Sequence, residues 1–334
     1  MRPGPLNLLT DVAGILVGNA EAPDFLSGTT VVLAEGRAVA AVDVRGGGPG
    51  TRETDVIAPG ALTGTVDAVV LSGGSAYGLD AASGVAEWLR DRGRGLAVAG
   101  SLVPIVPAAI LFDLSRGLDP SRPGTPLPYR ELGQLAAEGA GPSFRLGNEG
   151  AGLGATTAGA KGGLGSASLV WERPGAQPWT VGAIVAANAL GSALIPGTRH
   201  FRAAPFEQGA EFGGLGLPPK APQPAAIPSK RPLQAGANTT IALVATDAPL
   251  GREDARRLAI MAQDGIALAI HPAHTPFDGD AVFALATGRA AGPVTPEDLY
   301  VLGAMASICL ARAIARGIFE AETVVGIPAW RDLA

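Results

Sequence analysis

The sequence contains a single cysteine, Cys309, and only three histidines. One cysteine excludes an intrachain disulfide and a zinc site built on cysteine ligands. Cys309 lies in the apolar segment AMASICLARAIA, where we expect a small buried hydrophobic side chain rather than a nucleophile. The chemistry of the protein therefore has to come from other side chains.

Aromatic residues and runs of like charge are also scarce. The 334 residues include 9 Phe, 4 Trp and 3 Tyr, and the formal net charge is −5 without a run of Lys or Arg. Few aromatic rings leave little for nucleobases to stack on, and no basic run marks a surface for nucleic acid or an anionic membrane. We expect small molecules or neutral polymers as partners, no nucleic acid and no membrane.

Long uninterrupted apolar runs are absent as well. The N-terminal segment carries Asp11 and prolines where a signal peptide needs a continuous apolar core, so we expect a cytoplasmic protein. The longest apolar stretch, residues 95–112, is broken by Pro104 and Pro107 into pieces of strand length. We interpret this stretch as core.

Glycine and small apolar residues, by contrast, are abundant, with 48 Gly and 47% apolar content. Short β-type runs alternate with helical patterns, and many runs are apolar on both faces, which favours an α/β sandwich of layers in one domain of residues 1–334. Thr295, followed by Pro296 and two acids, indicates the start of the last helix. The expected strands are 28–34, 38–44, 68–74, 166–172, 180–188 and 239–246, and the expected helices are 78–92, 251–266 and 295–316.

Residues 201–238 are rich in Pro, Gly and Ala and lack periodicity, which predicts a long irregular linker loop. The linker ends at Asn238 and Thr239, directly before an apolar strand. If the bond between them is cut, the new α-amine of Thr239, with an ordinary pKa of about 7.7 to 8.0, is a local base for its own hydroxyl. From the pattern alone, an ordinary passage from loop to strand is the more common explanation.

Two acids follow forty residues downstream. Asp278 and Asp280 flank a glycine in a turn before a strand, a spacing that can aim both carboxylates to one side and separate their pKa values. An ordinary Asp-Gly turn is the plainer alternative. His271 and His274 raise a zinc site as a second alternative, but Pro272 and the loop setting argue against a helical ligand pair, and we predict no metal.

Three glycine-rich segments, 44–55, 71–84 and 147–165, are reminiscent of nucleotide loops. The third fails as a phosphate loop, because Ala160 stands where the motif needs Lys and Lys161 precedes Gly162. Lys161 remains a candidate cation beside a reacting amide, or else a solvated loop charge. Asn188, at the end of an apolar run, is a candidate oxyanion donor or, equally, a buried residue that ends a strand.

With these residues assembled, the chain resembles the self-processing N-terminal-nucleophile hydrolases that include the L-aminopeptidase/D-esterases, the β-aminopeptidases and the nylon-oligomer (6-aminohexanoate-oligomer) hydrolases. The resemblance rests on motifs in order along nearly the whole chain: LTDVAGILVGNA, SGTTVVL, VRGGGPGTRETD, LSGGSAYGLDAASGV, GATTAGAKGGLGSAS, NTTIALVATDAP and HTPFDGDAVFALATG. It implies a four-layer α-β-β-α sandwich without a cofactor. It further implies autocatalytic cleavage into an α chain, 1–238, and a β chain, 239–334, which assemble as a homotetramer.

The resemblance also implies roles for individual residues. Asn238 is the residue whose carbonyl is attacked, and Phe112 stands where the nylon-hydrolase pattern has a site tyrosine. We place Tyr77 and Phe112 on the substrate-binding side. The implied catalytic residues are the nucleophile Thr239, the oxyanion or substrate-amide donor Asn188, the neighbouring cation Lys161 and the positioning acids Asp278 and Asp280.

Thr after Asn together with the D-G-D motif is closer to the nylon-oligomer hydrolases, whereas many aminopeptidase members use Ser after Gly. We therefore expect an amidohydrolase of linear amides such as 6-aminohexanoate oligomers. The alternatives are an aminopeptidase or D-esterase acting on short peptides and amides, a threonine-dependent N-acyltransferase, and a binding protein without catalysis.

Overall fold

The computed structural model describes residues 1–114, 117–220, 227–230, 237–324 and 326–333. Within these ranges, nine strands form one hydrogen-bonded sheet in the order β10-β11-β12-β13-β2-β4-β7-β3, with β1 paired to β2. The strands are β1 Ile15–Ala22, β2 Ser27–Val44, β3 Thr51–Arg52, β4 Thr65–Ser72, β7 Ala108–Ile110, β10 Gly163–Trp171, β11 Trp179–Asn188, β12 Thr239–Thr246 and β13 Ala281–Ala286.

The long strand β2 joins the two halves of this sheet. Its first part pairs with β1 and β4, and its last residues pair with β13. The register with β4 shifts between Leu33 and Ala38, so the strand bends there. Two predicted strands, 28–34 and 38–44, are thus consecutive parts of β2.

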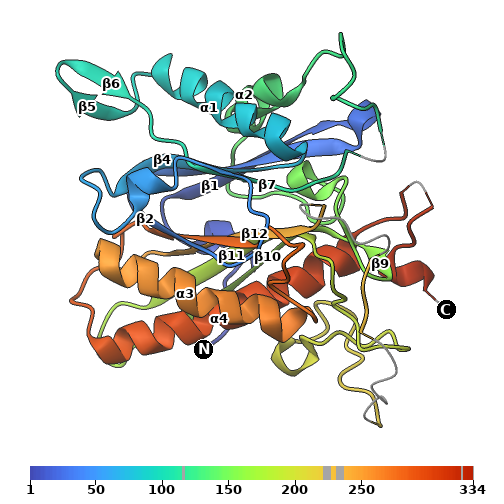
Figure 1. The fold of residues 1–334 in the computed structure, drawn as a ribbon. Helices are drawn as coiled ribbons and strands as arrows, with labels where there is room; N and C mark the ends of the chain where they lie inside the picture. Colours follow the sequence, from blue (N-terminus) through green and yellow to red (C-terminus); the bar gives the residue numbers. More distant parts are fainter. Residues whose placement is uncertain (115–116, 221–226, 231–236, 325, 334) are drawn as a thin grey trace.

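Helices cover the two outer faces of the folded sheet (Figure 1). On one side lie α1, Ala81–Arg90, and α2, Tyr129–Glu138; on the other lie α3, Arg252–Ala269, and α4, Pro296–Glu320. The predicted four-layer α-β-β-α sandwich is therefore confirmed. The 3-10 helices are Leu9–Asp11, Pro23–Phe25, Asp55–Ile57, Ser75–Asp80, Gly150–Gly152, Ala204–Phe206 and Trp330–Asp332.

Three hydrophobic cores fill the spaces between the four layers. The middle core brings Val32 and Leu71 of one sheet half against Leu243 and Phe283 of the other. The outer cores lie under α1 and α2 and under α3 and α4. Small residues allow close layers: a Cβ at Gly165 would lie 1.9 Å from the Ala313 carbonyl oxygen of α4.

Helix α4 begins as the sequence predicts. Thr295 Oγ accepts a hydrogen bond from the Asp298 amide at 3.2 Å in a capping box. By length and composition α4 could cross a membrane, but 72% of its most apolar window is buried, as in the core helix of a globular protein. Cys309 is fully buried on it, and burial raises the pKa of its thiol to about 12, which fits the structural role expected of this cysteine.

The apolar stretch 95–112 is only partly core, which corrects the interpretation made from the sequence. Among the described residues, strands β5, Leu96–Val98, and β6, Ser101–Val103, pair only with each other in a hairpin that projects from the molecule (Figure 1). Leu102 of this hairpin is 46% exposed. Only β7 joins the buried sheet. Periodicity could not show this, because it depends on whether a strand finds a neighbour in the sheet.

The described part of the predicted linker, residues 201–220, 227–230 and 237–238, is irregular apart from one 3-10 turn. The rest of the predicted linker lies outside the described residues. Its beginning is nevertheless anchored, since Phe201 and Phe212 are buried and meet edge to face. A long loop can thus still contribute to the core.

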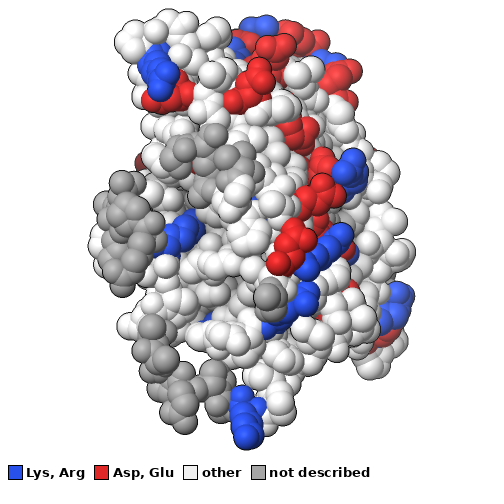
Figure 2. Space-filling model, turned by 90° about the vertical axis from the view of Figure 1, so that its right-hand side faces the viewer, with Lys and Arg blue, Asp and Glu red and all other residues white. Residues whose placement is uncertain are grey.

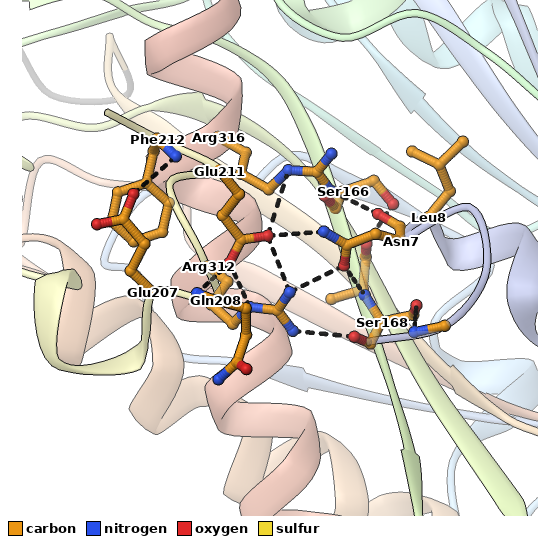
Figure 3. Close-up of polar contacts among 12 residues, drawn as sticks. Asn7, Leu8, Ser166, Ser168, Glu207, Gln208, Glu211, Phe212, Arg312 and Arg316 are labelled. Carbon is orange, nitrogen blue, oxygen red and sulfur yellow. Dashed lines mark hydrogen bonds and ion pairs between the residues drawn. The ribbon is translucent and has the colours of Figure 1, made fainter. Parts of the chain in front are cut away.

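A buried polar network fixes the same region (Figure 3). Arg312 of α4 is fully buried and donates to both carboxylate oxygens of Glu211, at 2.7 and 2.8 Å. It also donates to Asn7 Oδ1 and the Ser168 carbonyl oxygen, both at 2.9 Å. The network thereby ties the N-terminal loop, β10 and the start of the linker to α4.

Candidate active site

Three adjacent strands bring the predicted nucleophile, the Asn188 amide and the two acids together where these strands end or begin. Asn188, the last residue of β11, and Thr239, the first of β12, are register partners in an antiparallel pair. Strand β13 runs parallel to β12, so Asp278 lies beside Asn238 in a parallel bridge. The end of one strand and the starts of two others therefore meet, although they are far apart in sequence.

The peptide bond between Asn238 and Thr239 lies where these strands meet, and both residues are buried. Thr239 Oγ donates a hydrogen bond to the Asn238 carbonyl oxygen. The Gly279 amide donates to the same oxygen at 2.9 Å. A hydroxyl and a polarising N–H donor therefore converge on one carbonyl group, an arrangement suited to nucleophilic attack on it.

Gly279 needs to be glycine here. A Cβ at this position would lie 2.7 Å from the Gly48 carbonyl oxygen and 2.9 Å from Thr239 Oγ. The first glycine-rich segment packs directly on the acidic loop, since the Gly48 amide donates to the Asp278 carbonyl oxygen at 2.8 Å and the Gly46 amide to that of Asp280 at 3.2 Å. Its glycines allow close backbone packing around the candidate scissile bond.

Asp278 holds the segment that follows Asn188. Its carboxylate accepts from the Leu190 amide at 3.0 Å and from the Thr275 hydroxyl at 2.5 Å. Burial, and secondarily the charge of Asp280, raises the pKa of the Asp278 carboxyl. The neighbouring charge that the sequence predicts for the acidic pair therefore contributes to the raised pKa of Asp278.

Asp280 holds the start of β12. Its Oδ1 accepts from the Thr240 amide at 2.7 Å, and its Oδ2 accepts from the His274 amide at 3.0 Å and lies 2.8 Å from His274 Nδ1. Within the described part of the chain, neither Asp278 nor Asp280 hydrogen-bonds the Thr239 hydroxyl. Their carboxylates instead accept hydrogen bonds from backbone amides and side chains around Thr239.

The two histidines considered as metal ligands have separate surroundings. His274 faces Asp280, whereas His271 pairs through its backbone with Ser192. Across the described ranges, no three His, Cys, Asp or Glu side chains are placed to hold a metal ion. The role that the geometry gives His274, positioning an acid, was not predicted from the sequence.

Both polar atoms of the Asn188 side-chain amide are hydrogen-bonded. Its Oδ1 accepts from the Thr156 amide at 3.0 Å and from Lys230 Nζ at 3.1 Å, and its Nδ2 donates to the Phe112 carbonyl oxygen at 3.0 Å. In the uncut chain the Nδ2 group therefore faces Phe112. The direct backbone donor to the Asn238 carbonyl is Gly279 instead.

Lys161 lies near Asn188, on a small hairpin of β8, Thr156–Thr157, and β9, Ala160–Lys161. Its side chain is buried, and Nζ donates to the carbonyl oxygens of Gly152 and Gly162 at 2.9 and 3.0 Å. Its charge also acts on Asp113: burial raises the pKa of that carboxyl to about 6, while Lys161 opposes the rise. Lys161 is thus a buried cation near Asn188 rather than a solvated loop charge.

The two residues predicted for substrate binding lie on neighbouring segments. Phe112 contributes its main-chain carbonyl, which Asn188 uses. Tyr77, 37% exposed, lies in the 3-10 helix whose first residue, Ser75, donates its amide to the Leu111 carbonyl oxygen at 2.9 Å. Among the described residues, no hydrogen bond joins Tyr77 to the other predicted site residues.

A cavity of about 620 Å³ opens beside the linker. Among the described residues, its lining is mostly apolar and includes one charged side chain, that of Arg199. The face shown in Figure 2 carries acidic and basic side chains intermixed, with wide uncharged areas between them. The cavity is lined by Ala158, Gly159, Ser192, Leu194, Ile195, Pro196, Gly197, Thr198, Arg199, Pro228, Ser229 and Leu333.

Sequence reasoning missed three contributors, Gly279, Thr156 and Lys230, and considered His274 only as a metal ligand. Gly279 was visible only as the spacer of D-G-D, and its functional group is a backbone amide that any residue carries. Thr156 stands in the motif GATTAGAKGG, which drew attention for its lysine. Lys230 lies in the linker and gave no pattern at all.

Comparisons with solved structures show that the chain has a fold of the Ntn hydrolase class. The chain superposes on the L-aminopeptidase D-Ala-esterase/amidase of Ochrobactrum anthropi, described as a variant of the Ntn hydrolase fold, with a TM-score of 0.71, 25% identity and coverage of 98% of this chain and 89% of that one. A β-aminopeptidase of Burkholderia sp. shares the fold with a TM-score of 0.66 and 23% identity over 96% of this chain and 88% of that one.

Sequence comparison then gives the family. The chain belongs to Peptidase family S58, whose profile matches residues 7–329. It is 42% identical to an uncharacterized aminopeptidase of Mycobacterium tuberculosis over 98% of each chain. It is 29% identical to the 6-aminohexanoate-oligomer endohydrolase of Kocuria sp., over 88% of this chain and 78% of that protein. The protein is an amide-bond hydrolase.

Proposed function

We propose that the protein is a self-cleaving amidohydrolase whose nucleophile is Thr239. The observation that supports this proposal most directly is the convergence of the Thr239 hydroxyl and the Gly279 amide on the Asn238 carbonyl oxygen. A strand register that sets Asn188 opposite Thr239 adds a polar side chain at the same point.

In the first use of the hydroxyl, Thr239 Oγ attacks the Asn238 carbonyl carbon. The Oγ–C bond forms, the C–N bond to Thr239 breaks, and the hydroxyl proton passes to the leaving nitrogen, giving an ester and a free amine. Water then adds to the ester and releases Asn238 as a carboxylate and Thr239 as a new N-terminus. The Gly279 N–H stabilises the oxyanion that forms in the first step.

In the second use, the mature Thr239 hydroxyl attacks a substrate amide. Its own α-amine, with an ordinary pKa of about 7.7 to 8.0, accepts the hydroxyl proton and passes it to the leaving amine. The acyl-enzyme is then hydrolysed by water. Asn188 and the buried cation of Lys161 are the side chains we assign to stabilising developing negative charge.

For the substrate, we propose linear amides and, in particular, 6-aminohexanoate oligomers. Asn238 followed by Thr239, with the D-G-D motif of Asp278 and Asp280, supports this choice, as does the likeness to 6-aminohexanoate-oligomer endohydrolases. The apolar cavity beside the linker is suited to methylene chains.

An aminopeptidase acting on short peptides is the second candidate. It is favoured by the higher identity, 42%, to the mycobacterial aminopeptidase. The two candidates differ in what they need of the substrate, because an aminopeptidase recognises a free terminal amine whereas an endohydrolase cuts within a chain.

Mass spectrometry of the intact protein with N-terminal sequencing tests self-cleavage. We expect fragments of 238 and 96 residues, the smaller beginning Thr-Thr-Ile-Ala, and one full-length chain from Thr239→Ala. Two fragments from Thr239→Ala would contradict the assignment of the nucleophile.

Substrate type is tested on the matured protein with 6-aminohexanoate oligomers, free and N-acetylated, and with amino-acid amides. Cleavage of the acetylated oligomer supports the endohydrolase, whereas turnover confined to free amines supports the aminopeptidase. Adding a second amine as acceptor separates hydrolysis from acyl transfer.

A further inference from the structure

Lys230 is a linker residue that lies eight positions before the candidate scissile bond, yet contacts the site directly. Its ammonium donates to the main-chain oxygen of Asn188 at 2.9 Å and to Asn188 Oδ1 at 3.1 Å. Its own backbone amide donates to the Leu190 carbonyl oxygen at 3.1 Å. One linker residue thus makes three contacts to the segment 188–190.

This segment is held from two sides. Lys230 binds one side of it, and the Asp278 carboxylate accepts from the Leu190 amide at 3.0 Å on the other. Asn188 is in turn the register partner of Thr239. The position of the residue opposite the nucleophile therefore depends on the linker that is to be cut.

The chemistry of the contact gives it a second effect. Together with the Thr156 amide, which donates to the same oxygen at 3.0 Å, the ammonium of Lys230 holds the side-chain amide of Asn188 with Nδ2 toward the Phe112 carbonyl. A cation that hydrogen-bonds an amide oxygen polarises the amide and makes its N–H groups stronger donors. This polarisation is stronger in a partly buried site than in water. The cation thus both orders and polarises Asn188.

We infer that Lys230 is a positioning residue for self-cleavage, through which the uncut linker orders Asn188 and the segment 188–190 around Thr239. The inference rests on the proposed function. It assigns a task to the linker besides connecting two strands: the linker completes the site that cuts it.

The test is the rate of conversion of freshly synthesised full-length chain into fragments, followed by intact mass. Because a charge-assisted hydrogen bond is lost, we expect Lys230→Met to cleave at least roughly tenfold more slowly than the unchanged chain. Lys230→Arg keeps a cation and should recover most of the rate, which a merely structural role would not require. Lys220→Met, an exposed lysine of the same linker, is the matched control and should cleave normally.

The rates of these variants decide whether Lys230 positions Asn188 for self-cleavage. Equal rates for Lys230→Met and the unchanged chain, while the latter cleaves, overturn the inference and leave the proposed function standing. An unchanged chain that never cleaves overturns both. If Lys230→Met does not fold, as judged by its thermal melt, Lys230→Gln replaces it, and a Gln variant as fast as the Arg variant overturns the role of the cation.

Discussion

Asp280 accepts a hydrogen bond from the backbone amide of Thr240 at 2.7 Å, one residue beyond the candidate scissile bond. The same carboxylate faces His274 through its other oxygen. The start of β12 is therefore tied to the residue that precedes β13 in the uncut chain. If the bond is cut, we expect this hydrogen bond to keep Thr239 and Thr240 in place while the linker side is released.

Asp280→Asn should slow self-cleavage, since the amide keeps the shape of the carboxylate but loses its charge. Charge-assisted hydrogen bonds are about twice as strong as neutral ones, so we expect a rate roughly tenfold lower. The rate is measured by intact mass over time. Asp264→Asn, at an exposed position of α3, is the control, and equal rates for both variants would count against a positioning role for Asp280.

Gly279→Ala should leave a full-length chain. The added methyl group would lie 2.7 Å from the Gly48 carbonyl oxygen and 2.9 Å from Thr239 Oγ, so the loop has to shift and its amide moves away from the Asn238 carbonyl. Gly251→Ala, where a Cβ meets nothing within 4 Å, is the matched control. Normal fragments from Gly279→Ala would argue against the Gly279 amide as the oxyanion donor.

Asp113→Asn should change how stability depends on pH. Burial raises the pKa of Asp113 to about 6, above its unfolded value of about 3.9, so the folded chain binds its proton more tightly. The free energy of unfolding therefore falls as pH rises from about 4 to 6, by up to about 3 kcal/mol, and Asn removes this contribution.

Urea unfolding of the uncut Thr239→Ala chain with and without Asp113→Asn measures this effect, since a single chain can refold. The difference between the two proteins is the relevant quantity, because burial also raises the pKa values of Asp247 and Asp278. A difference that stays constant with pH would show that Asp113 does not titrate in this range.

Arg312→Met should destabilise the protein strongly, because it leaves the buried carboxylate of Glu211 without its main partner. Breaking a buried ion pair from one side costs about 3 to 5 kcal/mol. Arg331→Ala breaks an exposed pair with Glu320 and should cost about 1 kcal/mol or less. Thermal melting compares the two variants, and similar melting temperatures would contradict the importance of the network in Figure 3.

The same network has a consequence for a cleaved protein. Glu211 and Asn7 belong to the predicted α chain, whereas Arg312 belongs to the predicted β chain. If cleavage occurs, Arg312 therefore joins two separate chains, and its loss should promote their dissociation as well as unfolding.

The sequence by itself determined the elements with strong local signals. The strand at 239–246 is found unchanged as β12, and the Thr295 cap is found at the start of α4, because hydrophobic runs and capping residues act through near neighbours in the chain. Family motifs spread over the chain pointed to the sandwich and to Thr239 as the candidate nucleophile.

Only the tertiary structure decided which groups meet. The Gly279 amide is a backbone group without any signature in sequence, and Lys230 reaches Asn188 across 42 positions. The 95–103 segment is apolar but forms an exposed hairpin, since burial depends on neighbours in space. Sequence patterns record what each residue can do, whereas strand register and packing determine which carbonyl, amide and cation come within hydrogen-bonding distance.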